Sequence, residues 1–96
     1  MIRHIVCFKL AEATPAKCAE ARNVLLSMRG QVPTAQRIEV FVDELHSPRS
    51  FDLMLQVDLL SFADLERYQN DPYHCNVVKT HMHAVAERSI ALDFEL

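Results

Sequence analysis

Residues 37–59 decide the fold, and they read RIEVFVDELHSPRSFDLMLQVDL. Apolar residues alternate with polar or partly polar ones on both sides of a polar turn at residues 46–50. Alternation with a period of two is typical of a strand with one buried face, and two such runs around a short turn predict an antiparallel hairpin. We therefore expect one strand near residues 37–42 and another at residues 51–59.

A strand and a helix precede this hairpin. Residues 3–10 alternate like a strand, and apolar residues then recur at helical spacing over residues 15–29. Thr14 followed by Pro15 is a typical helix start, since the threonine can cap the helix and proline lacks the amide that would stay unpaired there. Gly30 lies where a left-handed residue commonly ends a helix.

A helix and a strand also follow the hairpin. Ser61 is the expected cap of a helix that Asp71 and Pro72 interrupt, and a second helical segment covers residues 73–85. Residues 88–95 alternate again and predict the last strand. The order β-α-β-β-α-β is the ferredoxin-like α+β motif, in which helices cover one face of a four-stranded antiparallel sheet. We expect residues 1–96 to form this single domain.

Length and charge restrict the function. A chain of 96 residues buries only about 60–70% of its unfolded surface, so a second chain or a ligand would add stability. A net charge of −3 without a basic stripe argues against nucleic-acid binding. No apolar run reaches the roughly 20 residues of a membrane span, and no signal peptide precedes the first strand, so we expect a cytoplasmic protein. The three cysteines form no disulfide or zinc pattern, and no cofactor is indicated.

The two faces of the predicted sheet differ in character. The richer apolar face is expected to lie under the helices, and it comprises His4, Val6, Phe8, Ile38, Val40, Val42, Leu53, Leu55, Val57, Ile90, Leu92 and Phe94. The opposite face carries Ile5, Cys7, Phe41, Met54 and Ala91 within a ring of charged residues. An apolar centre with a charged rim is typical of an interface, so we predict a homodimer across this face. The alternative is a solvated face with scattered apolar residues.

Four segments resemble the stress-responsive A/B barrel (Dabb) domain family. They are MIRHIV at residues 1–6, SPRSFD at residues 47–52, YQNDPYH at residues 68–74 and ERSIALDF at residues 87–94. The resemblance covers essentially the whole chain in order and spacing. It implies a dimeric α+β barrel, in which two four-stranded sheets pack face to face with their helices outside.

The resemblance leaves the activity open, because most members of the family have none established. Some plant members are linked to stress responses, and one branch contains a polyketide cyclase. This chain is similar to that branch at Tyr68, His74 and His4, where the family uses a histidine as acid/base and a tyrosine to hold the substrate. The cyclase carries a further histidine on the third strand, and Leu53 takes that position here, which puts the same reaction in doubt.

The residues themselves allow two interpretations of this set. The proline after Asp71 should bend the chain, so that Tyr68 and His74 can meet across a shared cavity. A histidine near neutrality is well suited to proton transfer, and a nearby hydroxyl could orient it or hold a ligand oxygen. Alternatively, His74 only stiffens a helix start and Tyr68 lies at the core edge. His4 either lines the same cavity or is a core histidine with a satisfied partner.

Several functions follow from these alternatives. The first is a small hydrophobic or aromatic ligand in a pocket between helices and sheet, lined by Phe8, Val24, Met28, Leu53 and Val78 as well as Tyr68 and His74. The second is an acid/base enzyme that uses the same pocket, resembling either the cyclase or a cofactor-independent monooxygenase of the same architecture. The third is a non-catalytic stress-stability oligomer with a filled core.

Other polar residues are weaker candidates. His81 and His83 are too close in sequence to bind one metal from a regular helix, and we expect both to be exposed or half-buried. Asp52 and Asp58 could gather a divalent cation at the rim of the dimer, although rim carboxylates are usually solvated. We therefore expect no metal site.

Overall fold

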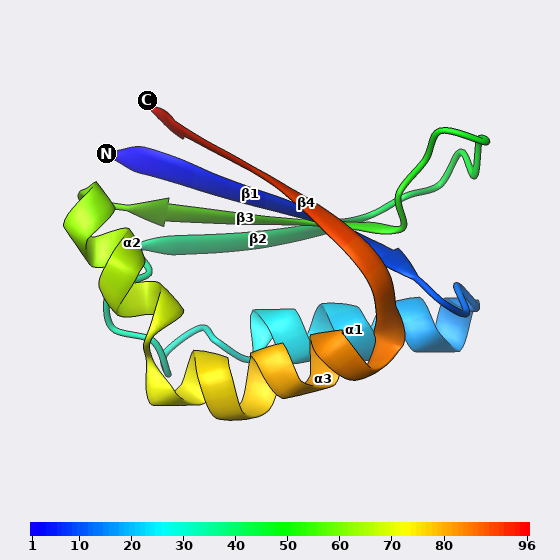
Figure 1. The fold of residues 1–96 in the computed structure, drawn as a ribbon, viewed down its shortest axis with the longest axis horizontal. Coiled ribbons are helices and arrows are strands. Elements are labelled where there is room, and N and C mark those ends of the chain that lie inside the picture. Colours follow the sequence, from blue (N-terminus) through cyan, green and yellow to red (C-terminus); the bar gives the residue numbers. More distant parts are fainter.

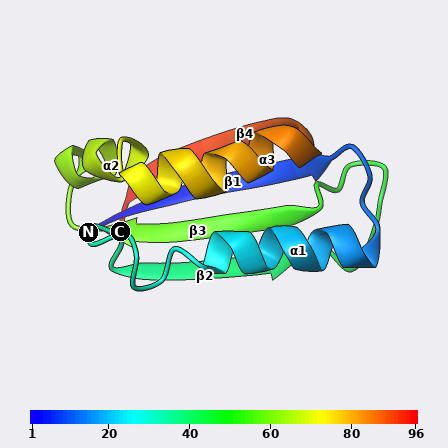
Figure 2. The same cartoon turned by 90° about the horizontal axis from the view of Figure 1, so that it is seen from below.

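The computed structural model describes residues 1–96 and has the predicted order of elements. These are β1 (Ile2–Leu10), α1 (Pro15–Leu26), β2 (Arg37–Val42), β3 (Leu53–Leu59), α2 (Phe62–Gln69), the π-helical segment η1 (His74–Lys79), α3 (Thr80–Val85) and β4 (Ala86–Glu95). The strands form one antiparallel sheet in the order β2-β3-β1-β4, and all helices lie on one of its faces (Figures 1 and 2). The predicted ferredoxin-like α+β fold is confirmed.

The predicted helix signals act as expected. The Thr14 hydroxyl accepts a hydrogen bond from the Lys17 amide at 3.2 Å, and the Ser61 hydroxyl accepts one from the Asp64 amide at 3.2 Å. Gly30 has a φ of +78°, the left-handed conformation that favours glycine. The first helix is shorter than the predicted range, because residues 27–30 continue as turns after Leu26.

The helical segment after residue 71 begins with a side-chain cap and a wide turn. The Asp71 carboxylate accepts hydrogen bonds from the backbone amides of Tyr73 and His74, at 2.8 and 3.3 Å. Pro72 takes the first helical position, where its missing amide costs nothing. From His74 the chain forms the π-helical η1 and continues directly into α3. The sequence predicts a helix here but not its π-helical turns, which are rare and frequent at functional sites.

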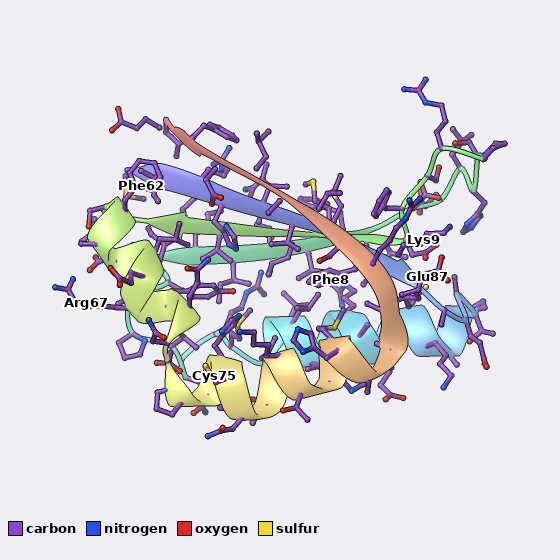
Figure 3. The ribbon with its side chains drawn as sticks, in the orientation of Figure 1. Phe8, Lys9, Phe62, Arg67, Cys75 and Glu87 are labelled. Carbon is purple, nitrogen blue, oxygen red and sulfur yellow. The ribbon has the colours of Figure 1, made fainter.

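The hydrophobic core lies between the helices and the sheet. Ile38 and Val40 of β2 and Leu53, Leu55 and Val57 of β3 are buried there, as the alternation predicts. Figure 3 shows Phe8 of β1 in the same layer, between the sheet and α1. No helix of the molecule has both the length and the apolar character that crossing a bilayer requires.

The predicted orientation of β4 is wrong. Antiparallel pairing sets Ala91 opposite Val6 and Asp93 opposite His4, and directly paired residues point to the same face of a sheet. Ala91 and Asp93 therefore face the helices. Ile90 and Leu92 face the other way and are 57% and 63% exposed. The prediction assigned the most apolar set to the core, whereas here the helix side of β4 borders a cavity and carries small or polar residues.

The face without helices is more apolar than predicted. Ile5, Cys7 and Met54 are half-buried on it and Phe41 is exposed. Ala91 was predicted on this face, but it faces the helices, and its neighbours Ile90 and Leu92 lie on this face instead. We use the name open face for the set Ile5, Cys7, Phe41, Met54, Ile90, Leu92 and Phe94.

The two carboxylates considered for a cation have partners within the chain. Asp58 forms an ion pair with Arg3, with N–O distances of 2.8 and 3.1 Å, and the guanidinium lowers the pKa of that carboxyl. Asp52 is buried and accepts a hydrogen bond from the Leu10 amide at 2.8 Å. Both carboxylates are buried rather than solvated; Asp58 links β3 to β1, and Asp52 links the segment before β3 to the end of β1.

Candidate functional site

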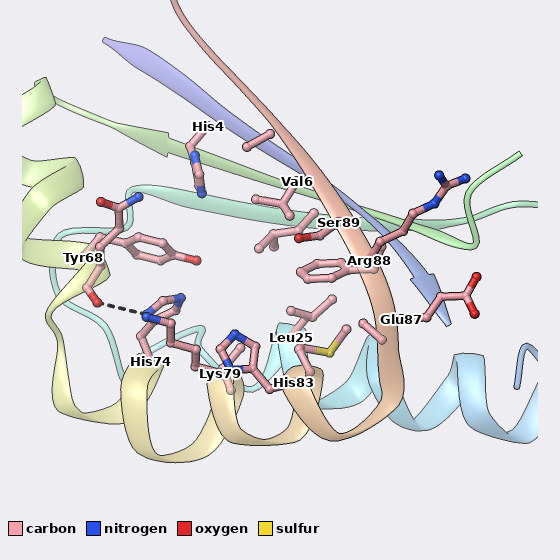
Figure 4. A pocket seen from close by; sticks show the side chains of 17 residues that line it. His4, Val6, Leu25, Tyr68, His74, Lys79, His83, Glu87, Arg88 and Ser89 are labelled. Carbon is pink, nitrogen blue, oxygen red and sulfur yellow. Dashed lines mark hydrogen bonds between the residues drawn. The ribbon is translucent and has the colours of Figure 1, made fainter. Parts of the chain in front are cut away.

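A cavity of about 480 Å³ lies between the sheet and the helical segment after residue 71 (Figure 4). Its walls come from β1, β3, β4, α1, α2, η1 and α3. The lining residues are His4, Val6, Phe8, Leu25, Leu55, Tyr68, Gln69, His74, Val78, Lys79, Met82, His83, Ala86, Glu87, Arg88, Ser89 and Ala91. The middle of the cavity is apolar and its two ends are polar.

Tyr68 is central to one polar end. It comes from the last turn of α2, and its side chain is fully buried. Its hydroxyl donates only to the sulfur of Met28, at 3.6 Å, and a thioether is a weak acceptor. Burial raises the pKa of this phenol, with a smaller contribution from the negative charge of Asp71, so the hydroxyl stays protonated.

Two histidines flank the Tyr68 ring. The His74 ring lies 4.6 Å from it, centroid to centroid, with a tilt of 41°. The His4 ring lies 5.8 Å away in an edge-to-face arrangement with an angle of 65°. Three chemically active side chains from β1, α2 and η1 therefore meet in one place, and Figure 4 shows them around the same end of the cavity.

His74 is held in a neutral state by its surroundings. Burial lowers its pKa, and the nearby positive charge of Lys79 lowers it further. The Gln69 carbonyl opposes this in part through a hydrogen bond with His74 Nδ1 at 3.3 Å, drawn as the dashed line in Figure 4. A neutral imidazole at neutral pH has a lone pair available to accept a proton.

His4 has a partner that the sequence did not reveal. It is buried, and its Nδ1 lies 2.5 Å from Oδ1 of Asp93. The prediction missed Asp93 because it turned β4 the wrong way and left this carboxylate on the outer rim. The available signal was that Ser89, Ala91 and Asp93, at alternate positions, are small or polar, whereas the residues between them are apolar.

The predicted lining residues divide into two groups. Phe8 and Val78 line the cavity. Val24, Met28 and Leu53 do not line it: Met28 and Leu53 are buried in the core, and Val24 is half-buried against that core. Leu53 pairs with Phe8 on one side and Val42 on the other, so it lies within the packed sheet.

The other end of the cavity was not predicted. It is formed by Glu87, Arg88 and Ser89, and Lys79 and His83 line the helical wall between His74 and this end. From one residue to the next, the chain turns through a smaller angle about the helix axis in η1 than in an α-helix. Residues after η1 therefore face a different direction from the one that an α-helix predicts, and His83 reaches the cavity. Arg88 is partly engaged elsewhere, since its guanidinium lies 5.1 Å above the centre of the Phe51 ring.

The arrangement can hold a small molecule and exchange a proton with it. Two imidazoles and a phenol hydroxyl converge beside apolar walls, which is the usual composition of a small-molecule site. No group of three or more histidine, cysteine or acidic side chains has the geometry to bind a metal. The site offers acid/base and hydrogen-bonding chemistry from its own side chains.

Solved structures share this fold. A dimeric ferredoxin-like protein of unknown function from Thermobifida fusca is 21% identical, with a TM-score of 0.84 over 99% of this chain and 90% of that one. A Dabb family protein from Mesorhizobium loti is 19% identical, with a TM-score of 0.75 over 99% and 95%. A hydroxynitrile lyase from Passiflora edulis is 16% identical, with a TM-score of 0.80 over 99% and 92%. Such identities show the fold alone.

None of the curated proteins compared with the chain matches it significantly. The family comparison is decisive, since the model of the stress-responsive A/B barrel domain (Dabb) matches residues 2–96. This agrees with the resemblance of the four sequence segments and with the observed order of strands and helices. The chain belongs to the Dabb family.

Proposed function

We propose that this protein binds a small, largely apolar or aromatic molecule in the cavity beside Tyr68, His74 and His4. The observation that carries the proposal is the Tyr68 hydroxyl, which is fully buried, borders the cavity and has only a sulfur atom as partner. Buried polar groups normally have good hydrogen-bond partners. A ligand oxygen in the cavity would supply a stronger one.

The size and walls of the cavity support the same proposal. Its volume of about 480 Å³ falls within the range of roughly 300–1,000 Å³ that is usual for small-molecule sites. Val6, Phe8, Leu55 and Val78 provide apolar contacts for a ring or a short chain. The polar atoms at the Tyr68 end would then fix the orientation of the molecule.

A cavity-filling variant tests this proposal. Ala91 lines the cavity from β4, and Ala91→Phe would occupy a large part of it. Ala84→Phe makes the same substitution at an exposed position of α3 and serves as the matched control. We expect NMR to show that fragments from an aromatic panel bind to the native protein and to the control but not to Ala91→Phe. Equal binding to all three proteins would refute the proposal.

An acid/base reaction in the same cavity is the second candidate function. It is favoured by the lowered pKa of His74 beside a protonated tyrosine, because a neutral base next to a hydrogen-bond donor can remove a proton from a bound carbon acid. The test is hydrogen exchange of aromatic methyl ketones in deuterium oxide. If the native protein catalyses the exchange and His74→Gln does not, the result supports an enzyme. If the native protein gives no exchange above the rate in solvent alone, this chemistry is rejected.

We further propose that two chains associate across the open face to form a dimeric α+β barrel. Exposed Phe41 on one edge strand and exposed Ile90 on the other are joined across the sheet by half-buried Met54 and Cys7, without cover from any helix. Contiguous apolar patches of this kind usually mark interaction sites. The dimeric description of structural neighbours supports the same arrangement. A cytoplasmic location stays a prediction, which cell fractionation would test.

A further inference from the structure

Both imidazoles of the site are held at Nδ1 by a group that only accepts hydrogen bonds. The Asp93 carboxylate lies 2.5 Å from Nδ1 of His4, and the Gln69 carbonyl lies 3.3 Å from Nδ1 of His74. An ionised carboxylate and a backbone carbonyl carry no hydrogen to donate. The hydrogen in each contact must therefore be on the imidazole nitrogen.

This fixes which atom each ring offers to the cavity. A neutral imidazole has one protonated nitrogen and one nitrogen with a free lone pair. With the hydrogen on Nδ1, the lone pair is on Nε2. Neither His4 Nε2 nor His74 Nε2 has a partner within the chain, and Figure 4 shows both rings pointing into the cavity on either side of the Tyr68 ring.

We infer that Asp93 is a positioning residue that holds His4 as a hydrogen-bond acceptor, and that the cavity selects a ligand with hydroxyl donors, such as a phenol or an alcohol, over a carboxylate. This inference rests on the proposed function and specifies its ligand. Two acceptors, at His4 and His74, and one donor, at Tyr68, are complementary to a molecule that presents two hydroxyl groups and an oxygen lone pair.

The charges around the cavity do not favour an anion at this end. Glu87 balances the charge of Arg88 at the far end, and Lys79 beside His74 is exposed, so solvent weakens the effect of its charge. Arg88 is also engaged over Phe51. A carboxylate beside Tyr68 would face two imidazole lone pairs without a buried cation, which is an unfavourable way to bury a charge.

The hydrogen positions can be measured on the protein without any ligand. Long-range proton–nitrogen NMR spectra distinguish Nδ1-protonated from Nε2-protonated imidazoles. At neutral pH we expect His4 to be Nδ1-protonated in the native protein and in Asp93→Asn, whose amide oxygen still accepts. We expect Asp93→Leu to lose this pattern at His4 while His74 keeps it. Glu95→Leu, on the same strand, is the matched control and should leave both rings unchanged.

These spectra can also overturn the positioning role. An Nε2-protonated or doubly protonated His4 in the native protein would contradict it. A His4 tautomer that stays the same in Asp93→Leu would show that the carboxylate does not set it. Because no ligand is present, these outcomes do not depend on the proposed function.

The ligand class is tested with three probes of similar size. They are hydroquinone in degassed buffer, its dimethyl ether and benzoate. We expect hydroquinone to bind at least about tenfold more tightly than the ether, because only hydroquinone can donate hydrogen bonds to the two imidazoles. We expect Asp93→Leu to remove most of this difference, with Asp93→Asn restoring it.

The outcomes separate the inference from the proposed function. If the dimethyl ether binds in the cavity as tightly as hydroquinone, or benzoate binds most tightly, the ligand class is wrong and the small-molecule site stands. If no probe perturbs the cavity residues, both the ligand class and the proposed function fail for aromatic molecules.

Discussion

The hydroxyl of Tyr68 is buried without a strong hydrogen-bond partner in the chain. Tyr68 donates only to the Met28 sulfur, whereas Tyr73 donates to the Ser27 hydroxyl at 2.7 Å. The two tyrosines lie near each other in the sequence but differ in the quality of their hydrogen bonds. Their hydroxyls therefore make different contributions to folding, and this difference can be tested.

We predict that Tyr68→Phe changes the free energy of unfolding by less than about 0.5 kcal/mol, because the bond it removes is weak. It should weaken binding of an oxygen-bearing aromatic ligand by about tenfold. Tyr73→Phe is the matched control and should lower the free energy of unfolding by about 0.5–1.5 kcal/mol without affecting binding. Urea unfolding and ligand titration measure both effects, and a larger stability loss in Tyr68→Phe would contradict this assignment.

His74 gives a prediction for stability against pH. Burial lowers its pKa in the folded protein below the usual value of 6.5, so the unfolded chain binds the proton more readily. The free energy of unfolding should therefore fall as the pH drops through 6.5 toward the lowered pKa, and His74 should contribute nothing to this slope at higher pH. Urea unfolding across this pH range should show a shallower decline for His74→Gln. Parallel curves for the two proteins would be inconsistent with a half-buried, neutral His74.

At the scale of single residues, part of the candidate site could be predicted from the sequence. Tyr68, His74 and His4 could be singled out because a proline-induced bend and a polar residue on an apolar strand face are local signals. Asp93 could not, since its role depends on which way β4 faces. His83 could not either, because its position depends on the wide turns of η1.

Among the elements, η1 has the strongest effect on the geometry of the site. Its π-helical turns hold one more residue per turn than an α-helix would, and they set the direction of His74 relative to Val78 and Met82. A change in the number of residues within η1 should therefore change the site more than a change of side chain on its outer surface.

We predict that inserting one alanine after Asn76, an exposed residue of η1, rotates His74 by about 100° relative to the following residues, because turns that already hold an extra residue cannot take up another. The insertion should preserve the helix content and abolish ligand binding, while the control Asn76→Ala binds like the native protein. Circular dichroism and ligand titration give the two measurements. Unchanged binding by the insertion variant would mean that the helical phase of η1 does not position the site.

The element scale also shows where sequence patterns fail. Capping residues and turn signals located the helices, because those signals act within a few residues. The facing of β4 was wrong because an alternating pattern shows that a strand has two different faces but not which neighbour covers each one. In this fold the apolar register of β4 points to the open face and the polar register to the cavity.

For the whole molecule, the open face predicts the state of association. Leu92 is 63% exposed on the edge strand β4, where it pairs with Ile5, so Leu92→Lys would bury an unpaired charge in the proposed dimer. Light scattering coupled to size-exclusion chromatography should show a dimer for the native chain and a monomer for Leu92→Lys. Val77→Lys, at an exposed position on η1, is the matched control and should remain dimeric. A native chain that runs as a stable monomer at micromolar concentration would rule out this dimer.

We propose above all that the ligand binds in the cavity between the helices and the sheet, on the opposite side of the sheet from the open face. Adjacent residues of β4 report on the two sides, since Ala91 lines the cavity and Leu92 is exposed on the open face. The most direct measurement is the mapping of NMR shift changes when an aromatic fragment binds. We predict changes at Ala91, His4 and His74 with little change in the Leu92 side chain. Changes centred on the Leu92 side chain and the rest of the open face would contradict the claim.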